Sequence, residues 1–225
     1  MKYQIIGETV PAVEIELNNG ETMVSQSGGM TWQTEGIEMK TNTNGGIMKG
    51  LGRMFAGESI FMNSYTASRD GAKIAFASTV PGTIMPVQVE DFKNGLTIQK
   101  GAFLCSQKGV ELSIELTKKF TSGLFGGEGF ILQGAKGTGT LFLEIDGDAV
   151  IKDLQPGEVI KVDTGNVVAF EKGVNYTVET IKGLSNIFLG GEGLFITRLV
   201  GPGRVVLQTQ NFNDFSGRIL SRIRK

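Results

Sequence analysis

The sequence predicts an all-β fold in which three internal repeats of short antiparallel strands build one domain. Three observations predict it: two patterns that recur in the same order, apolar runs with the periodicity of strands, and a composition rich in glycine. Of the 225 residues, 33 are glycine, 5 are proline and 40% are hydrophobic. This composition is typical of a globular protein with many turns between short strands.

The first recurring pattern is a pair of glycines eight residues apart. It occurs three times, at Gly28 and Gly36, at Gly101 and Gly109, and at Gly165 and Gly173. A turn signal precedes each pair, at Asn19-Gly20, Asn94-Gly95 and Pro156-Gly157. Such dipeptides typically connect antiparallel strands, so each copy is expected to be a β-module.

The second recurring pattern is a Gly-Glu element, at Gly57-Glu58, Gly127-Glu128 and Gly191-Glu192. Its copies are 70 and 64 residues apart, close to the 73 and 64 residues that separate Gly28, Gly101 and Gly165. The two patterns therefore recur together as one unit. We expect a single triplicated β domain over 1–225, with repeats of about 1–80, 81–145 and 146–210 and a C-terminal tail over 211–225.

Within the units, apolar and polar residues alternate with a period of two, as over 13–17, 140–144 and 174–178. This alternation, bounded by glycine, asparagine and proline, indicates half-buried strands of a sandwich or barrel. One unit alone is small for an independent core. The three units are therefore expected to share one core around a pseudo-threefold axis, in a β-sandwich-like body.

The composition also excludes several classes of function. The net charge of −1 provides no field that would gather nucleic acid. The absence of histidine removes Ser-His-Asp and Cys-His catalysis and the commonest transition-metal ligand. The one cysteine, Cys105, occupies the repeat position of Trp32 and Ala169, which predicts a buried core thiol. We therefore expect no enzyme activity, no cofactor and no metal site.

Two features of the sequence indicate the cellular compartment of the protein. Residues 1–8 lack the apolar run of a signal peptide, and no stretch is long and apolar enough to span a bilayer. The sequence therefore predicts a cytoplasmic protein.

The repeated glutamates Glu58, Glu128 and Glu192 have two interpretations. Three carboxylates around an axis could share a cation, or each could accept hydrogen bonds from the amides of its own glycine turn. We predict the local role, so Gly57, Gly127 and Gly191 and the glutamates that follow them are repeat-motif turns.

The linkers before the Gly-Glu elements form a candidate interaction patch. They are richer in apolar residues than turns require, with Leu51, Met54, Phe55, Leu124, Phe125, Leu184, Ile187 and Phe188 as the proposed members. Repetition would place them at one end of the body, where an uncovered patch would drive self-association or contact with a protein or membrane. The alternative is that each linker plugs the end of its own sandwich.

The C-terminal tail has four basic residues in its final eight positions. As a helix, it would place Ile219, Leu220 and Ile223 on one stripe beside arginines, which indicates docking on an anionic surface. The alternative is that this apolar side packs against the β-body.

The three linkers continue as Lys49-Gly50-Leu51, Ser122-Gly123-Leu124 and Lys182-Gly183-Leu184 before the Gly-Glu elements. With them, the chain over 1–210 resembles the family called domain of unknown function 124, whose mitochondrial branch is altered inheritance of mitochondria protein 24. The resemblance implies a double-stranded β-helix-like fold, similar to three fused subunits of the tryptophan RNA-binding attenuation protein. It implies no catalytic residues. The first copy departs from the pattern at Ala56 and Ser59.

These observations predict a non-enzymatic binding or scaffold protein that contacts a protein partner, itself or a membrane surface through its repeated loops. The alternative is a small-ligand or RNA-binding protein, by analogy with the attenuation protein. That analogy rests on the fold alone. Because the chain has one tryptophan and no net positive charge, nucleic acid is not an expected partner.

Overall fold

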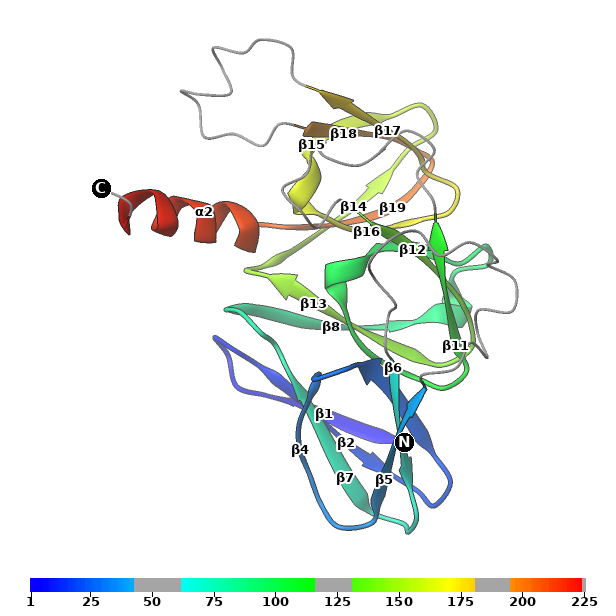
Figure 1. Ribbon diagram of the computed structural model, residues 1–225. Helices are drawn as coiled ribbons and strands as arrows, with labels where there is room; N and C mark the ends of the chain where they lie inside the picture. Colours follow the sequence, from blue (N-terminus) through cyan, green and yellow to red (C-terminus); the bar gives the residue numbers. More distant parts are fainter. Residues whose placement is uncertain (43–61, 116–130, 181–194, 224–225) are drawn as a thin grey trace.

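The computed structural model describes residues 1–42, 62–115, 131–180 and 195–223 (Figure 1). These residues form antiparallel strands and one C-terminal α-helix, so the predicted all-β class is confirmed. The strands make four sheets, here numbered from the N-terminus. Within the described part of the chain, no helix combines the length and the apolar character that crossing a membrane requires.

Sheets 1 and 2 contain strands from residues 2–146. Sheet 1 has the order β1-β2-β7-β4, with β1 (Lys2–Ile6), β2 (Ala12–Leu17), β7 (Ala72–Ala77) and β4 (Met30–Gln33). Sheet 2 has the order β5-β6-β3-β10-β13-β8, with β5 (Ile37–Asn42), β6 (Met62–Ala67), β3 (Thr22–Gln26), β10 (Phe103–Gln107), β13 (Thr140–Asp146) and β8 (Gly82–Gln88).

Sheets 3 and 4 contain strands from residues 96–208. Sheet 3 has the order β11-β12-β9-β16-β19-β14, with β11 (Val110–Glu115), β12 (Leu132–Gly137), β9 (Leu96–Gln99), β16 (Val167–Glu171), β19 (Gly203–Gln208) and β14 (Ala149–Leu154). Sheet 4 has the order β15-β18-β17, with β15 (Val159–Asp163), β18 (Phe195–Val200) and β17 (Asn175–Thr180). Short 3-10 turns are η1 (Val89–Asp91), η2 (Lys100–Ala102) and η3 (Thr164–Asn166), and the chain ends in helix α2 (Phe212–Ile223).

The local predictions agree with these elements. The alternating segments 13–17, 140–144 and 174–178 coincide with β2, β13 and β17 to within two residues. The predicted turns place Gly20, Gly95 and Gly157 at φ values of 84°, 83° and 78°. This left-handed region strongly favours glycine, which explains why the turn residue is the same in all three places.

The expectation of one shared core needs correction, because the described residues form three hydrophobic clusters. The first lies between sheets 1 and 2, the second between sheets 2 and 3, and the third between sheets 3 and 4. The sheets follow one another along the elongated body, from the blue strands of sheet 1 at one end to β15, β17 and β18 of sheet 4 at the other, so the clusters between them do the same (Figure 1). Cys105 is fully buried in the first cluster, which confirms the predicted core thiol.

Candidate functional site

The residues that the sequence singled out as sites lie outside the described residues. This holds for the repeat-motif turns, Gly57, Glu58, Gly127, Glu128, Gly191 and Glu192. It holds equally for the candidate interaction patch, Leu51, Met54, Phe55, Leu124, Phe125, Leu184, Ile187 and Phe188. Both remain predictions.

The described strands show where these three segments are attached. Each leaves and re-enters an antiparallel strand pair near facing positions: Asn42 and Met62 in β5–β6, Glu115 and Leu132 in β11–β12, and Thr180 and Phe195 in β17–β18. Each of the three segments therefore connects two adjacent antiparallel strands.

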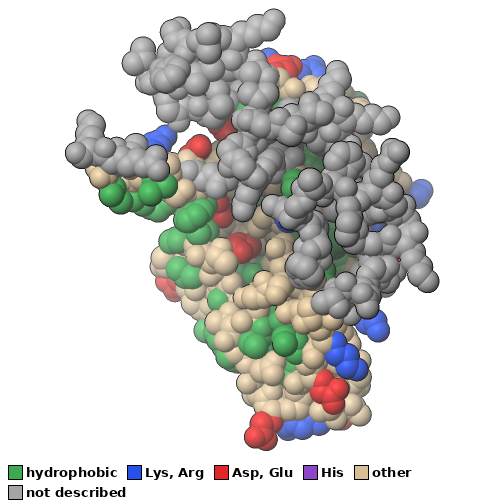
Figure 2. All heavy atoms as spheres, viewed as in Figure 1, with side chains coloured by type: hydrophobic (Ala, Val, Ile, Leu, Met, Phe, Trp, Pro, Cys, Tyr) green, Lys and Arg blue, Asp and Glu red, His purple; other side chains and the backbone are tan. Residues whose placement is uncertain are grey.

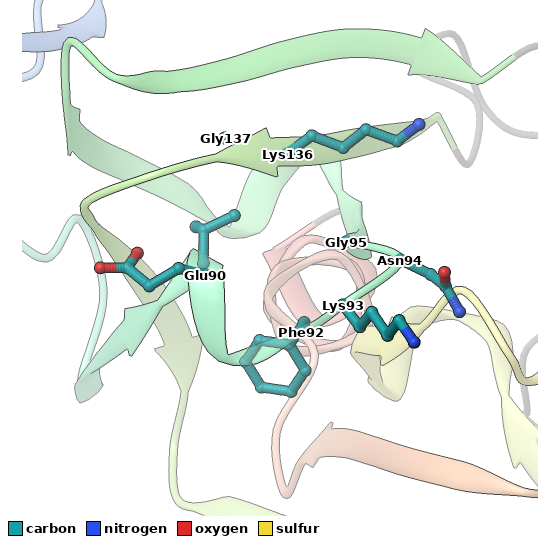
Figure 3. A pocket seen from close by; sticks show the side chains of 8 residues that line it. Glu90, Phe92, Lys93, Asn94, Gly95, Lys136 and Gly137 are labelled. Atoms are coloured by element: carbon teal, nitrogen blue, oxygen red, sulfur yellow. The ribbon is translucent and has the colours of Figure 1, made fainter.

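An open hollow of about 480 Å³ lies between η1, the turn before β9 and the end of β12. The Lys93 and Lys136 amines and the Asn94 amide point toward the same side of it, with Phe92 below them (Figure 3). Gly95 forms the close contact between the two walls, because a Cβ there would lie 2.6 Å from the Ala135 carbonyl oxygen. The hollow presents two cations to solvent, so it could accept a small anion.

Glu90 also lines the hollow, but its carboxylate points away from the lysines (Figure 3). Its Oε2 accepts a hydrogen bond from the Gly139 N–H at 2.8 Å, and this bond lowers the pKa of the Glu90 carboxyl. Glu90 therefore stays ionised near neutral pH and holds the turn after β12. It does not neutralise the lysines directly.

Glu144 of β13 is the most deeply buried carboxylate of the described residues, and the sequence did not mark it as special. Its Oε1 accepts hydrogen bonds from Ser78 Oγ at 3.0 Å and from Thr79 Oγ1 at 2.6 Å, and a further one from the Thr79 N–H. These donors lie in the connection between β7 and β8. Glu144 therefore fastens the connection between sheets 1 and 2, which is a structural role.

Helix α2 begins at a contact with the body. Asp146 Oδ2 accepts a hydrogen bond from the Phe212 N–H at 2.8 Å, and the Phe215 N–H donates to the Asn211 carbonyl at 3.0 Å. Partial burial raises the pKa of the Asp214 carboxyl, as does the charge of Asp163. The first turn of α2 is therefore anchored, and the rest of the helix projects from the body (Figure 1).

Helix α2 carries an exposed apolar stripe along its whole length. Its members recur at the spacing of one helix face: Phe212, Phe215, Ile219, Leu220 and Ile223. Their exposed fractions range from 45% at Ile219 to 71% at Ile223. Hydrophobic side chains gather along the same side of the helix in Figure 2. Of the two interpretations of the tail, packing against the β-body is therefore not the arrangement observed.

The stripe predicted from the sequence, Ile219, Leu220 and Ile223, lacked Phe212 and Phe215. Phe212 and Phe215 lie seven and four residues before Ile219, so the same periodicity could have included them. The anchor at Asp146 could not be found in this way, because it is 66 residues distant along the chain. Over the described ranges, no group of His, Cys, Asp or Glu side chains is arranged to hold a metal ion.

Comparison with known proteins agrees with this picture. The crystal structure of a protein from Streptococcus pyogenes matches with a TM-score of 0.77 and 25% identity, covering 98% of this chain and 99% of that one. An uncharacterized protein of S. pyogenes serotype M6 is 30% identical over 217 residues, which is 93% of this chain and 85% of that protein. The expected likeness to the attenuation protein remains a prediction. A family model described as mitochondrial biogenesis AIM24 matches residues 3–210, and the chain therefore belongs to this family.

Proposed function

We propose that this chain is a non-enzymatic binding or scaffold protein that docks on an anionic membrane surface through helix α2. The observation that carries the proposal is the exposed apolar stripe of α2. Soluble monomers seldom leave such a stripe uncovered without a binding role. The proposed location is the cytoplasm, where the protein would be a peripheral membrane component.

The charges of α2 favour a lipid surface over an apolar protein groove. Arg218 and Arg222 are carried on the same helix as the stripe, and the sequence continues with Arg224 and Lys225. A helix with an apolar face and basic flanks lies in the headgroup region, where each Lys or Arg near an anionic surface contributes roughly 1 kcal/mol. The anchored first turn would hold this face outward.

Sedimentation with lipid vesicles tests the proposal. We expect the protein to bind vesicles of phosphatidylcholine mixed with phosphatidylserine, and to bind pure phosphatidylcholine much more weakly. The double substitution Ile219→Ser with Ile223→Ser should abolish binding. Ile151→Ser is the matched control, because Ile151 is a half-exposed isoleucine of β14 on the β-body. Failure of the wild type to bind, or equal binding by the double variant, would overturn the proposal.

The absence of enzyme activity is part of the same proposal. Support comes from the lack of histidine in the sequence and from the full burial of Cys105. Glu144 adds support, because its buried carboxylate is already occupied by donors from Ser78 and Thr79. A catalytic acid or base must instead be free to meet a substrate.

We also propose that the scaffold consists of three related units. Support comes from the register shifts within three strand pairs. These lie between Met30 and Trp32 against β7, between Phe103 and Cys105 against β13, and between Val167 and Ala169 against β19. Trp32, Cys105 and Ala169 occupy one position of the repeated sequence pattern, four residues after Gly28, Gly101 and Gly165. A bulge repeated at that position is expected of repeated units.

The hollow beside Lys93 and Lys136 favours the small-ligand alternative as a second candidate. Its open, cationic wall suits a phosphate-bearing small molecule better than an apolar one. Calorimetric titration with pyrophosphate tests it, with Lys93→Ala plus Lys136→Ala as the variant that should lose binding. Titration with a short oligoribonucleotide distinguishes RNA binding from the binding of a small phosphate-bearing molecule.

A further inference from the structure

The two internal sheets are each built from two halves of three strands. In sheet 2, the half β5-β6-β3 joins the half β10-β13-β8 through the antiparallel pair β3–β10. In sheet 3, the half β11-β12-β9 joins the half β16-β19-β14 through the pair β9–β16. Both junctions therefore pair a strand from an earlier part of the chain with one from a later part.

Sheets 1 and 4 contain the same halves without a partner. Sheet 4, β15-β18-β17, has the composition of a first half, and β15 is its free edge. Sheet 1 contains β4-β7-β2, the composition of a second half, extended by β1, and β4 is its free edge. In the described part of the chain, β15 pairs with β18 alone and β4 pairs with β7 alone.

We propose that copies of this chain associate head to tail, with β15 of one copy pairing antiparallel to β4 of the next. The joined sheet would have the order β17-β18-β15-β4-β7-β2, the same as that of sheets 2 and 3. The inference rests on the three-unit organisation proposed above. The partner is a second copy of this chain, because the free strand that completes the sheet order beside β15 is β4, which every copy carries.

The existing junctions predict the register of the new one. Cys105 faces Ser25 in β3–β10, and Ala169 faces Ile98 in β9–β16. Ser25 and Ile98 each lie three residues before a repeated glycine, Gly28 and Gly101.

Applied to the free edges, this rule selects the residues that pair. Val162, three residues before Gly165, would face Trp32 of the next copy, since Trp32 shares the position of Cys105 and Ala169. Lys161 would then face Gln33, and Ile160 would face Thr34.

Burial distinguishes the free edge from the existing junctions. Cys105 and Ala169 are 0% and 1% exposed. Cys105 packs into the first cluster, between sheets 1 and 2, and Ala169 packs into the second cluster, between sheets 2 and 3. Trp32, at the corresponding position, is 40% exposed. In the joined sheet, Trp32 would reach the third cluster of the neighbouring copy, where Ile160 and Val178 are only partly buried.

The backbone of β4 is oriented for this pairing. The Thr34 N–H donates to the Lys73 carbonyl of β7 at 2.9 Å. Because successive N–H groups of a strand alternate in direction, the Gln33 N–H is directed to the free side of β4. At the existing junctions, the N–H groups of Lys108 and Lys172 likewise cross to the carbonyls of Thr22 and Gly95, both at 3.2 Å.

The two ends that would pair lie at opposite ends of the body (Figure 1). One chain therefore does not pair its own β15 with its own β4 in this structure. An interface between two different surfaces of identical chains is heterologous, and it propagates into a ring or a filament. An unprotected strand edge is also the standard template for adding a strand from another chain.

Sedimentation velocity across a concentration series tests association. We expect the wild type to form dimers and larger species as its concentration rises. Gln33→Pro removes one outward N–H and leaves the Thr34–Lys73 bond, so it should raise the dissociation constant about tenfold or more. Ile219→Ser with Ile223→Ser should associate like the wild type, which separates this inference from the membrane proposal. A wild type that stays monomeric throughout would overturn the inference.

Disulfide trapping between engineered cysteines tests the register of the proposed β15–β4 pairing. It also tests the association itself if Gln33→Pro unfolds the protein. The predicted pairing would place the Cα atoms of Gln33 and Lys161 about 5.5 Å apart, within the range that a disulfide spans. A mixture of the Gln33→Cys and Lys161→Cys proteins should form a disulfide-linked dimer on mild oxidation. The control is a mixture of the Lys152→Cys and Lys161→Cys proteins, in which Lys152 lies on the edge strand β14. This mixture should form no disulfide-linked dimer. Equal linkage in both mixtures, or none in the first, would contradict the proposed pairing.

Discussion

Asp146 accepts a hydrogen bond from the Phe212 N–H at 2.8 Å, and this contact joins the end of β13 to the first residue of α2. The first N–H groups of a helix have no partner within it, so a carboxylate there satisfies a donor and favours the helix dipole. The direction of the projecting helix thus depends on a residue of sheet 2.

Asp146→Ala should loosen α2, because it removes the carboxylate that accepts the hydrogen bond from the Phe212 N–H. Loss of such an acceptor costs about 0.5–2 kcal/mol of helix stability. Hydrogen exchange of the amides in α2 measures this directly. Asp146→Asn retains an acceptor oxygen and is the matched control. If Asp146→Ala leaves exchange in α2 unchanged, the contact does not anchor the helix.

Asp146 should also make the stability depend on pH. Partial burial raises the pKa of its carboxyl above 3.8, the bond from Phe212 acts in the opposite direction, and the charge of Glu144 raises it further. Because the folded-state pKa lies above the unfolded-state pKa, the folded protein binds the proton first as the pH falls. The unfolding free energy of the wild type should therefore rise relative to that of Asp146→Asn as the pH falls through the raised pKa toward 3.8.

Urea unfolding of the two proteins at a series of pH values measures this difference, and Asp146→Asn cancels the contributions of all other groups. A wild type that loses stability relative to Asp146→Asn over that interval would show that the carboxylate, rather than its protonated form, is favoured by the fold.

Glu144→Ala should be strongly destabilising. It leaves the Thr79 hydroxyl and N–H without this acceptor and leaves the Ser78 hydroxyl with the Val80 carbonyl, at a site where Glu144 is only 8% exposed. Because the Thr79 donors are only partly buried and the Ser78 hydroxyl keeps the Val80 carbonyl, we expect a total loss of about 1–3 kcal/mol. Glu144→Gln keeps one acceptor oxygen and should lose less.

Chemical denaturation measures these losses. Asp148→Ala is the control, since Asp148 is an exposed carboxylate near the same connection and should change the unfolding free energy by about 0.5 kcal/mol at most. Equal effects of Glu144→Ala and Asp148→Ala would contradict the fastening role of Glu144.

Local features of this fold were predictable, because they depend on neighbouring residues. Alternation over 13–17 determines which face of β2 is buried, and the turn at Asn19-Gly20 requires a positive φ that glycine readily adopts. The all-β class follows from many such segments.

The order of the sheets was not predictable in the same way. Ser25 Oγ donates to the Leu104 carbonyl at 2.7 Å across 79 residues, and no local pattern specifies that contact. The expected shared core was wrong for the same reason: strand pairing between distant parts of the chain produces four successive sheets with a hydrophobic cluster between each two. The exposure of Ile219 and Ile223 likewise follows from the long-range anchor at Asp146, whereas their periodicity was visible in the sequence.

Cys105 should be unreactive in the folded protein. It is 0% exposed, and burial raises the pKa of its thiol well above 9.0, so the reactive thiolate is scarce at neutral and mildly alkaline pH. A thiol reagent such as dithionitrobenzoate should label the native protein very slowly and the protein in concentrated guanidinium chloride at once. Ser27→Cys is the control, because Ser27 is exposed and its replacement should react in the native state. Rapid labelling of native wild type would show that β10 separates from β3 readily, and the junction that serves as the template for head-to-tail pairing would then be weak.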